Sequence, residues 1–281
     1  MLVRPKLFLD TNVCINVASG RIPPREWSRV QRHINKRYRY CISFITVKEL
    51  FSKLARGADD YIDKNKAPLR VLYGLAKRRF LPYPSVFTLR TVLNMQSAAR
   101  VADTHSLPEE VALEDELNAV LDAPGKAQLK AGFVMRKKEK TLFRTFDLDD
   151  FDVHENGPQN EHADLLQGMR EGSIDKPDPL KVAAWMLHQH DLPPYPEQCE
   201  RLAASLDAAY RFGYSLSQMT KDPAYDFHRH ASDWGDTLQL MYLCDESMHF
   251  LTSDRDFRIR TKGSAQASRI LLYPDFVRDL P

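Results

Sequence analysis

Short apolar segments, each running into an acidic residue and a helix-forming stretch, are found at both ends of this 281-residue chain. Strands are predicted at Lys6–Leu9, Tyr40–Phe44, Met248–Thr252 and Arg269–Tyr273, with an edge strand at Arg79–Pro82, where proline forbids a central position. In a parallel sheet with helical crossovers, every strand ends and every following helix starts at the same edge. The sequence therefore predicts an α/β fold with a central parallel sheet between two layers of helices.

Four acidic residues occupy the predicted strand ends and helix starts. Asp10 closes the first strand, and Glu49 lies in the first turn of a helix predicted from Val47 to about Arg56. Asp236 opens a helix predicted over Ser232–Glu246, and Asp254 follows the strand Met248–Thr252. All four carboxylates are expected at one crevice, where they repel one another at neutral pH unless cations occupy it. A divalent metal is the natural occupant.

Each acid also has a purely structural interpretation. Asp10 could form an Asx-turn after its strand, and Glu49 is three residues beyond Thr46, the spacing of a capping box. Asp236 could be favoured by the helix dipole, and Asp254 could be the N-cap of its own helix. These interpretations stay open for each acid alone, but four independent structural acids have no need to share one edge.

The middle of the chain is predicted to be mainly helical. We expect the α/β unit to comprise residues 1–100 and 205–281, with a helical insertion at 101–204. Helices are predicted at Arg25–Arg39, Pro108–Leu121, Lys126–Lys140, Pro177–His190 and Pro196–Tyr214. Residues 60–79 are also helix-prone, but Pro68 is expected to break or start a helix there.

Bulk composition excludes several classes of protein. A hydrophobic fraction of 43% and a net charge of +2 are ordinary for a globular protein, so affinity for a polyanion must come from local patches. The four cysteines are far apart, which argues against a zinc ribbon or a disulfide framework. No apolar run is long enough for a membrane span, and the first strand leaves no room for a signal peptide. A cytoplasmic location is expected.

Four segments resemble the motifs of PIN-domain nucleases in the same order along the chain. Leu7-Phe8-Leu9-Asp10-Thr11-Asn12 resembles the opening strand of that family, and Thr46-Val47-Lys48-Glu49-Leu50 resembles its second motif. Gly235-Asp236-Thr237 resembles the third motif, and residues 250–257, with Thr252, Asp254, Asp256 and Phe257, resemble the fourth. The resemblance covers about residues 1–100 and 205–281. The interval between Glu49 and Asp236 is much longer than in a compact PIN domain, which places the helical insertion there.

This resemblance implies a PIN-like α/β/α fold and a metal-dependent endoribonuclease that hydrolyses single-stranded or structured RNA. It implies one or two Mg²⁺ or Mn²⁺ ions held by Asp10, Asp236, Asp254 and Glu49, because oxygen ligands suit hard cations. Thr11 or Asn12 is expected to fix Asp10 by hydrogen bonding. Asp233 and Asp256 are reserve acids.

Cationic side chains are expected to contact the phosphates of the substrate. Arg25, Arg29, Arg32 and Lys36 recur at helical spacing and form a basic stripe, while Arg255 and Arg258 directly follow the fourth acid. An ordinary solvated face is the alternative for the helix. The segment 226–230, with two histidines, is interpreted as a loop in preference to a zinc site.

Two other functions compete with the nuclease. One is a PIN-like module that binds nucleic acid without turnover, which RNA binding without metal-dependent cleavage would favour. The other is a phosphatase of the haloacid-dehalogenase type, but that family needs an Asp where this chain has Asn12. The expected partner is nucleic acid, RNA in preference to DNA. Since small PIN proteins are often toxins, a toxin-like role, an antitoxin-type protein partner and a homodimer are further options that the family leaves open.

Overall fold

The strand β1 (Lys6–Leu9) is the central strand of a five-stranded, all-parallel sheet in the computed structural model. The strand order is β3-β2-β1-β4-β5, with the other strands at β2 (Arg39–Ile42), β3 (Arg79–Phe80), β4 (Met248–Thr252) and β5 (Ile270–Leu272). Lys6 is in register with both Arg39 and Met248, so β1 pairs with a strand from each end of the chain. The predicted parallel sheet and the edge position of β3 are confirmed.

The structure describes residues 4–56, 62–76, 79–95, 117–125, 128, 178–219, 221–222, 224–225 and 233–280, without the side chains of 52, 53, 55, 56, 62, 233 and 234. The helices predicted at Pro108–Leu121 and Lys126–Lys140 lie largely or wholly outside this range, as does the histidine segment 226–230. Residues 117–122 are helical.

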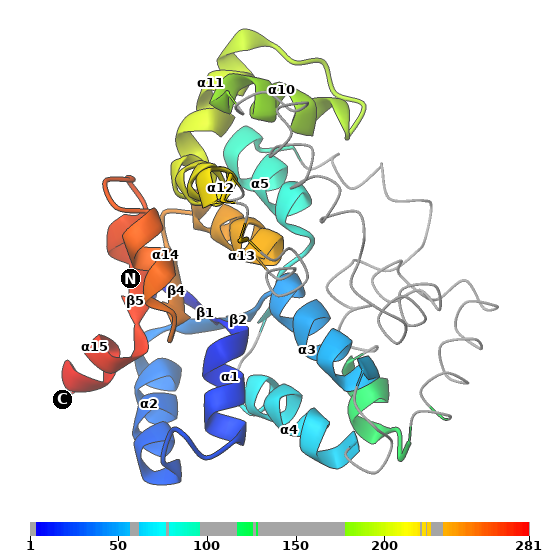
Figure 1. The fold of residues 1–281 in the computed structure, drawn as a ribbon, viewed down its shortest axis with the longest axis vertical. Coiled ribbons are helices and arrows are strands. Elements are labelled where there is room, and N and C mark those ends of the chain that lie inside the picture. Colours follow the sequence, from blue (N-terminus) through cyan, green and yellow to red (C-terminus); the bar gives the residue numbers. More distant parts are fainter. Residues whose placement is uncertain are drawn as a thin grey trace.

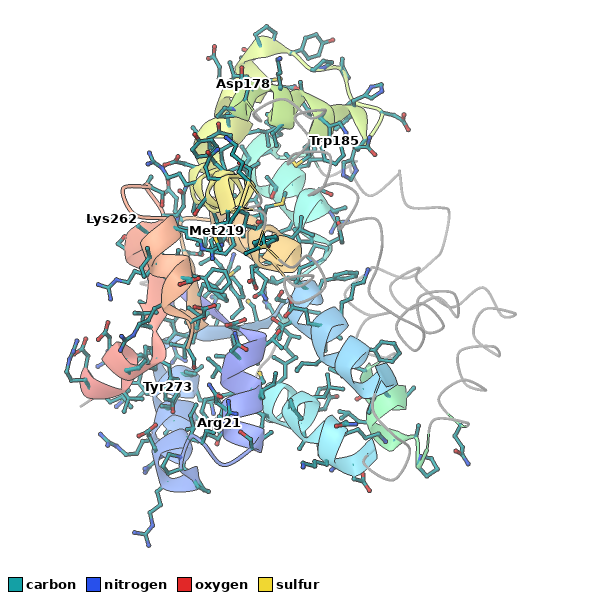
Figure 2. All side chains as sticks on the ribbon, viewed as in Figure 1. Arg21, Asp178, Trp185, Met219, Lys262 and Tyr273 are labelled. Carbon is teal, nitrogen blue, oxygen red and sulfur yellow. The ribbon has the colours of Figure 1, made fainter. Side chains whose placement is uncertain are left out.

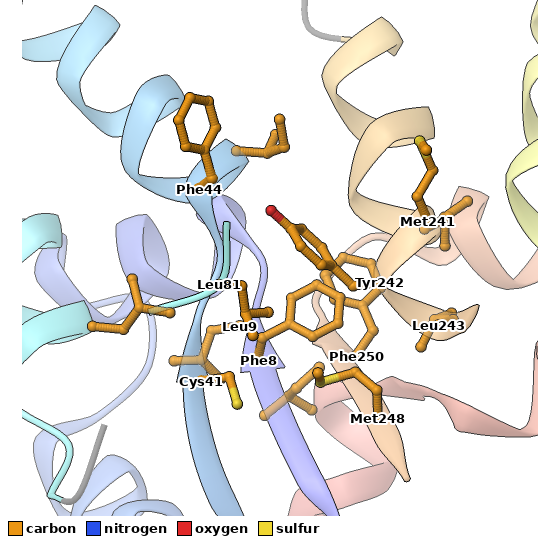
Figure 3. Packing of buried hydrophobic residues seen from close by; sticks show 14 of the residues in the cluster. Phe8, Leu9, Cys41, Phe44, Leu81, Met241, Tyr242, Leu243, Met248 and Phe250 are labelled. Carbon is orange, nitrogen blue, oxygen red and sulfur yellow. The ribbon is translucent and has the colours of Figure 1, made fainter. Parts of the chain in front are cut away.

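The strands are apolar because helices cover both faces of the sheet. Leu7, Phe8 and Leu9 are fully buried. Phe8 stacks on Phe250 of the neighbouring strand, with ring centroids 4.7 Å apart, and Tyr242 meets Phe8 edge-on at 5.5 Å (Figure 3). This aromatic group joins β1 to β4 and therefore fixes the two strands that carry Asp10 and Asp254 at their ends.

Helices lie on two sides of the sheet (Figure 1). One side carries α1 (Thr11–Ala18), α2 (Pro24–Arg37) and α4 (Ile62–Tyr73), and the other carries α5 (Pro84–Leu93), α12 (Asp207–Met219), α13 (Asp233–Leu240) and α14 (Arg255–Arg260). The helix α3 (Phe44–Arg56) contacts both α4 and α13. The remaining helical elements are α10 (Pro179–His188), α11 (Pro196–Ser205), η3 (Met241–Cys244), η4 (Ala267–Arg269) and α15 (Tyr273–Arg278). The arrangement is consistent with a three-layer α/β/α fold.

Several predicted helix bounds are wrong. The helix α3 begins at Phe44 and not at Val47, so Glu49 lies in its second turn. The helix α4 continues through Pro68, although proline can donate no N–H to the carbonyl one turn earlier. The single helix predicted at Pro196–Tyr214 is two helices, α11 and α12, with Leu206 as the C-cap of α11. The helix predicted at Ser232–Glu246 narrows after Leu240 into the 3₁₀ segment η3.

The described part of the predicted insertion packs on the α/β unit. The helix α11 contacts both α10 and α5. Buried residues of α10 and α11, among them Leu187 and Leu202, belong to the same apolar cluster as the strands. No helix in the described part of the chain has the length and apolar character needed to cross a membrane.

Candidate active site

The candidate site lies where the chain changes direction within the sheet. From β1 the chain adds β2 and β3 on one side, and β4 and β5 later add on the other side. In open α/β sheets, ligands bind at the carboxyl ends of the strands that flank such a switch point. Here those strands are β1 and β4, which end next to Asp10 and Asp254. The backbone N–H of Asp10 also donates to the carbonyl of Leu251 at 2.9 Å, which extends the pairing to the strand ends.

Asp10 is held for something other than capping its helix. It occupies the N-cap position of α1 and is only 1% exposed, yet its side chain makes no cap hydrogen bond. The hydroxyl of Thr252 donates to Asp10 Oδ2 at 2.7 Å instead. The pKa of Asp10 is raised to about 6, chiefly by burial and also by the nearby Asp254 carboxylate, although Thr252 and the backbone N–H groups of Thr11 and Asn12 lower it. The hydrogen bonds therefore offset only part of the cost of burying the negative charge of Asp10.

Asp254 combines a structural role with proximity to Asp10. Its side chain accepts a hydrogen bond from the backbone N–H of Asp256 at 2.8 Å, which makes it the N-cap of α14 as its structural interpretation predicted. Its own N–H donates to Thr252 Oγ1 at 3.0 Å. One hydroxyl thus joins the two acids, accepting from Asp254 and donating to Asp10. Among the described residues, no lysine or arginine forms an ion pair with either acid.

The capping-box interpretation of Glu49 is wrong. The N–H of Thr46 donates to Ser43 Oγ at 3.3 Å, so Ser43 caps α3, and the Thr46 hydroxyl donates to the carbonyl of Leu9 at 2.9 Å. The Glu49 carboxylate lies one turn deeper and accepts a hydrogen bond from the hydroxyl of Thr11. Because Thr11 directly follows Asp10, this bond attaches the second acid to the end of β1.

Glu49 also lies against the first turn of α13. A Cβ atom at position 235 would stand 2.6 Å from Glu49 Oε1 and 3.6 Å from Ile45 Cγ2, so only glycine allows this approach. Asp236 is the next residue along α13 and is half-buried. The contact places Glu49 between the end of β1 and the start of the helix that carries Asp236.

Thr11 and Asn12 act on Asp10 through their backbone N–H groups, which lower its pKa. The side chain of Thr11 is buried and serves Glu49, while Asn12 is exposed. The side chain that positions Asp10 is that of Thr252, which in the sequence stands out only as part of the fourth motif. Of the reserve acids, Asp256 forms an exposed ion pair with Arg260 at 2.8 Å, and the side chain of Asp233 lies outside the described residues.

The predicted phosphate-contacting residues fall into two different environments. Arg25, Arg29, Arg32 and Lys36 are all exposed on α2. On α14, Arg255 is exposed, whereas Arg258 is paired with Asp275 at 2.7 Å. The last turn of α2 leads into the amino end of β2, where the N–H of Arg39 donates to the carbonyl of Pro5. That part of the basic stripe is therefore at the edge of the sheet opposite to the acids.

The donor chemistry of the site suits a hard divalent cation, because all four candidate ligands are carboxylates. In the part of the chain that the structure describes, no group of three or more His, Cys, Asp or Glu side chains is arranged to hold a metal ion. The pair that the structure shows in electrostatic contact is Asp10 with Asp254. Comparison of the chain with protein-family models, curated proteins and solved structures gives no match.

Proposed function

We propose that this protein is a PIN-type, metal-dependent nuclease that hydrolyses phosphodiester bonds of single-stranded or structured RNA. The observation that carries the proposal is the state of Asp10, a buried carboxylate with a raised pKa beside a second carboxylate at the switch point of a parallel sheet. Acids with strongly shifted pKa values in such a crevice are candidates for a functional site. An N-cap role alone does not explain Asp10, because its carboxylate also accepts a hydrogen bond from Thr252 and lies beside Asp254.

Asp10, Asp236 and Asp254 would hold the ion, with Glu49 as a further ligand or as the holder of a metal-bound water. A bound Mg²⁺ or Mn²⁺ would supply an activated water and stabilise negative charge on the phosphate oxygens. The chain itself contributes orientation. Thr252 fixes one oxygen of Asp10, and Thr11 fixes one oxygen of Glu49. A divalent cation would also reverse the raised pKa of Asp10, because an adjacent positive charge favours the ionised carboxylate.

The test is cleavage of labelled single-stranded RNA and DNA in EDTA, Mg²⁺ and Mn²⁺, with Asp10→Asn as the matched variant. We expect RNA cleavage only with metal, and a loss of about three orders of magnitude in Asp10→Asn because a central ligand is removed. Mn²⁺ should also raise the melting temperature of the wild-type protein more than that of the variant. Metal-independent cleavage, or equal cleavage by Asp10→Asn, would exclude the proposal.

A module that binds nucleic acid without turnover is the second candidate, and the same experiment separates the two functions. RNA binding without any cleavage in Mg²⁺ or Mn²⁺ would favour the silent module. Binding is measured by fluorescence anisotropy in EDTA, so that it does not depend on the metal site.

A further inference from the structure

The helix α2 presents a row of cations to solvent. Arg25, Arg29, Arg32 and Lys36 are exposed, while Trp27, Val30 and Ile34 on the other face are buried in the core. The four cations are spread over twelve residues, so Arg25 and Lys36 are about 16 Å apart along the helix axis at 1.5 Å per residue. We call these four residues the α2 row. Its length exceeds what a single phosphate group could contact.

Part of the α2 row lines a hollow. Arg29, Arg32, His33 and Lys36 line an open depression of about 260 Å³ together with Leu280, which lies just beyond α15. The ring of His33 meets Phe276 of α15 edge-on at 5.5 Å, which holds the two helices together there. Figure 1 shows α15 beside α2, and Figure 2 shows Tyr273 at the start of α15. The depression therefore combines residues from both ends of the chain.

Three of the residues that line this depression, Arg29, Arg32 and Lys36, are cations. Burial lowers the pKa of His33, and the neighbouring Arg37 and Lys36 cations lower it further. Among the described residues, no acid forms an ion pair with any member of the α2 row. The acids of α15 have other partners, because Asp275 pairs with Arg258 and Arg278, and Arg278 also pairs with Asp279.

Other cations among the described residues form ion pairs. On α14, Arg260 is paired with Asp256, is 12% exposed and lies 5.1 Å from the ring centroid of Phe212. Arg70 pairs with Asp63, and Arg211 pairs with Asp207. The α2 row differs because its charges converge on a concave surface and lack such partners in the described part of the chain. Uncompensated cations arranged in a row are suited to a ligand with a row of negative charges.

We infer that the α2 row and the depression beside α15 bind consecutive phosphates of a nucleic acid strand. The choice of nucleic acid as the polyanion rests on the proposed nuclease function. Contacts of this kind position a strand without reading its sequence. Because the last turn of α2 is at the amino edge of the sheet, the row holds part of the strand away from the carboxylates. Removing the cations of the α2 row therefore weakens RNA binding but leaves the carboxylates at the opposite edge of the sheet unchanged.

The test uses the full chain in EDTA and a fluorescent single-stranded RNA of about 20 nucleotides, a length within which several phosphates can contact one protein. The variant is Arg29→Ala, Arg32→Ala, Lys36→Ala, and the matched control is Arg70→Ala, Arg211→Ala, Lys181→Ala, which removes the same charges from α4, α12 and α10. Alanine favours the helix, so both variants should fold, which circular dichroism verifies. We expect a Kd increase of about tenfold or more for the α2 variant and less than about twofold for the control.

The salt dependence gives a second measurement. Loss of three phosphate contacts should reduce the slope of log K against log salt concentration by about 2 for a single strand. Equal binding and equal slopes for the α2 variant and the control would overturn the inference. So would complete competition by millimolar inorganic phosphate, which would indicate a site for one free anion.

Cleavage at saturating RNA distinguishes the inference from the proposed function. If the inference is right, the α2 variant cleaves at the wild-type rate once RNA is saturating, while Asp10→Asn binds RNA normally and cleaves nothing. If the α2 variant keeps its affinity for RNA, the inference about binding is wrong, but cleavage that depends on Asp10 can still be observed. If the wild-type protein does not cleave RNA, the proposed function is wrong, but binding that depends on the α2 row can still be observed.

Discussion

The carboxylate edge of the sheet and the α2 row carry opposite charge in opposite environments. At the edge, Asp10 is buried and tied to Thr252, and its pKa is raised to about 6. Along α2 the cations are exposed to solvent. A buried charge costs folding free energy but interacts strongly with whatever reaches it, whereas exposed charges cost little and are screened by salt. The difference suggests a division of labour, with chemistry at the buried edge and attraction of the substrate at the exposed helix.

The largest expected effect concerns the free-energy cost of ionising the buried Asp10. The native pKa of Asp10, about 6, lies above the ordinary value of 3.8 for this side chain. Between these values the native state binds more protons than the unfolded state, so stability falls as pH rises and levels off above pH 6. Asp10→Asn should therefore be more stable than wild type at pH 7 by up to about 3 kcal/mol. The free energy of unfolding is measured with urea in EDTA from pH 4 to 8. The variant should lack the fall in stability that the wild-type protein shows as pH rises through this range. A destabilised variant at pH 7 would contradict the cost assigned to this acid.

The next effect concerns the contact between Glu49 and α13. Gly235→Ala would place a methyl group 2.6 Å from Glu49 Oε1, so the carboxylate must leave its position. In a Glu49→Ala background the same substitution should stabilise the protein by about 1 kcal/mol, because alanine is the better helix former. A double-mutant cycle on the free energy of unfolding should give a coupling of about 1–2 kcal/mol. Additive effects on the free energy of unfolding would mean that Glu49 does not contact α13 closely. If Glu49 belongs to the active site, the cleavage rate of Gly235→Ala should also be lower than that of the wild-type protein.

A smaller effect is expected for the hydroxyl that joins the two acids. Thr252→Val keeps the shape of the side chain but removes the donor to Asp10 and the acceptor for the N–H of Asp254. We expect a loss of about 1–2 kcal/mol of stability and a rise in the pKa of Asp10, since the lost hydrogen bond lowers it. The acidic limb of the pH–rate profile for cleavage should then move to higher pH. Thr252→Ser, which retains the hydroxyl, is the control, and an unmoved profile in Thr252→Val would show that the bond does not tune Asp10.

The smallest effect should follow removal of a paired cation. Arg258 is bound to Asp275, so Arg258→Ala should change the Kd for RNA by less than about twofold. The single variant Arg29→Ala in the α2 row is the comparison, measured under the same salt conditions. If Arg258→Ala weakens binding as much as Arg29→Ala, the distinction between paired and unpaired cations does not describe the binding surface.

The sequence predicts those features that depend on local pattern. The strands β1 and β4 were predicted at their observed bounds because apolar runs ending at an acid are unambiguous. The same-edge rule for parallel strands then places Asp10 near Asp254, and the structure confirms that these two acids interact. The spacing of the cations on α2 likewise predicts their common exposed face.

The features that the sequence could not predict depend on contacts between distant segments. The role of Thr252 requires β1 and β4 to be adjacent, although they come from opposite ends of the chain. The need for glycine at 235 appears only when α13 packs on Glu49. Pairing of Arg258 with Asp275 similarly depends on how α14 and α15 meet. Local propensity contains no information about these pairings, and it predicts that Pro68 breaks or starts a helix, whereas α4 continues through it.

The central position of β1 has a consequence for the biosynthesis of the protein. The strand β1 is synthesised more than two hundred residues before its partner β4. Pairings between such remote segments form late, because the intervening chain must first be synthesised and ordered. A nascent polypeptide therefore carries Asp10 long before Thr252 and Asp254 exist to complete its surroundings. In the proposed nuclease, the surroundings of Asp10 would therefore stay incomplete until β4 has been synthesised.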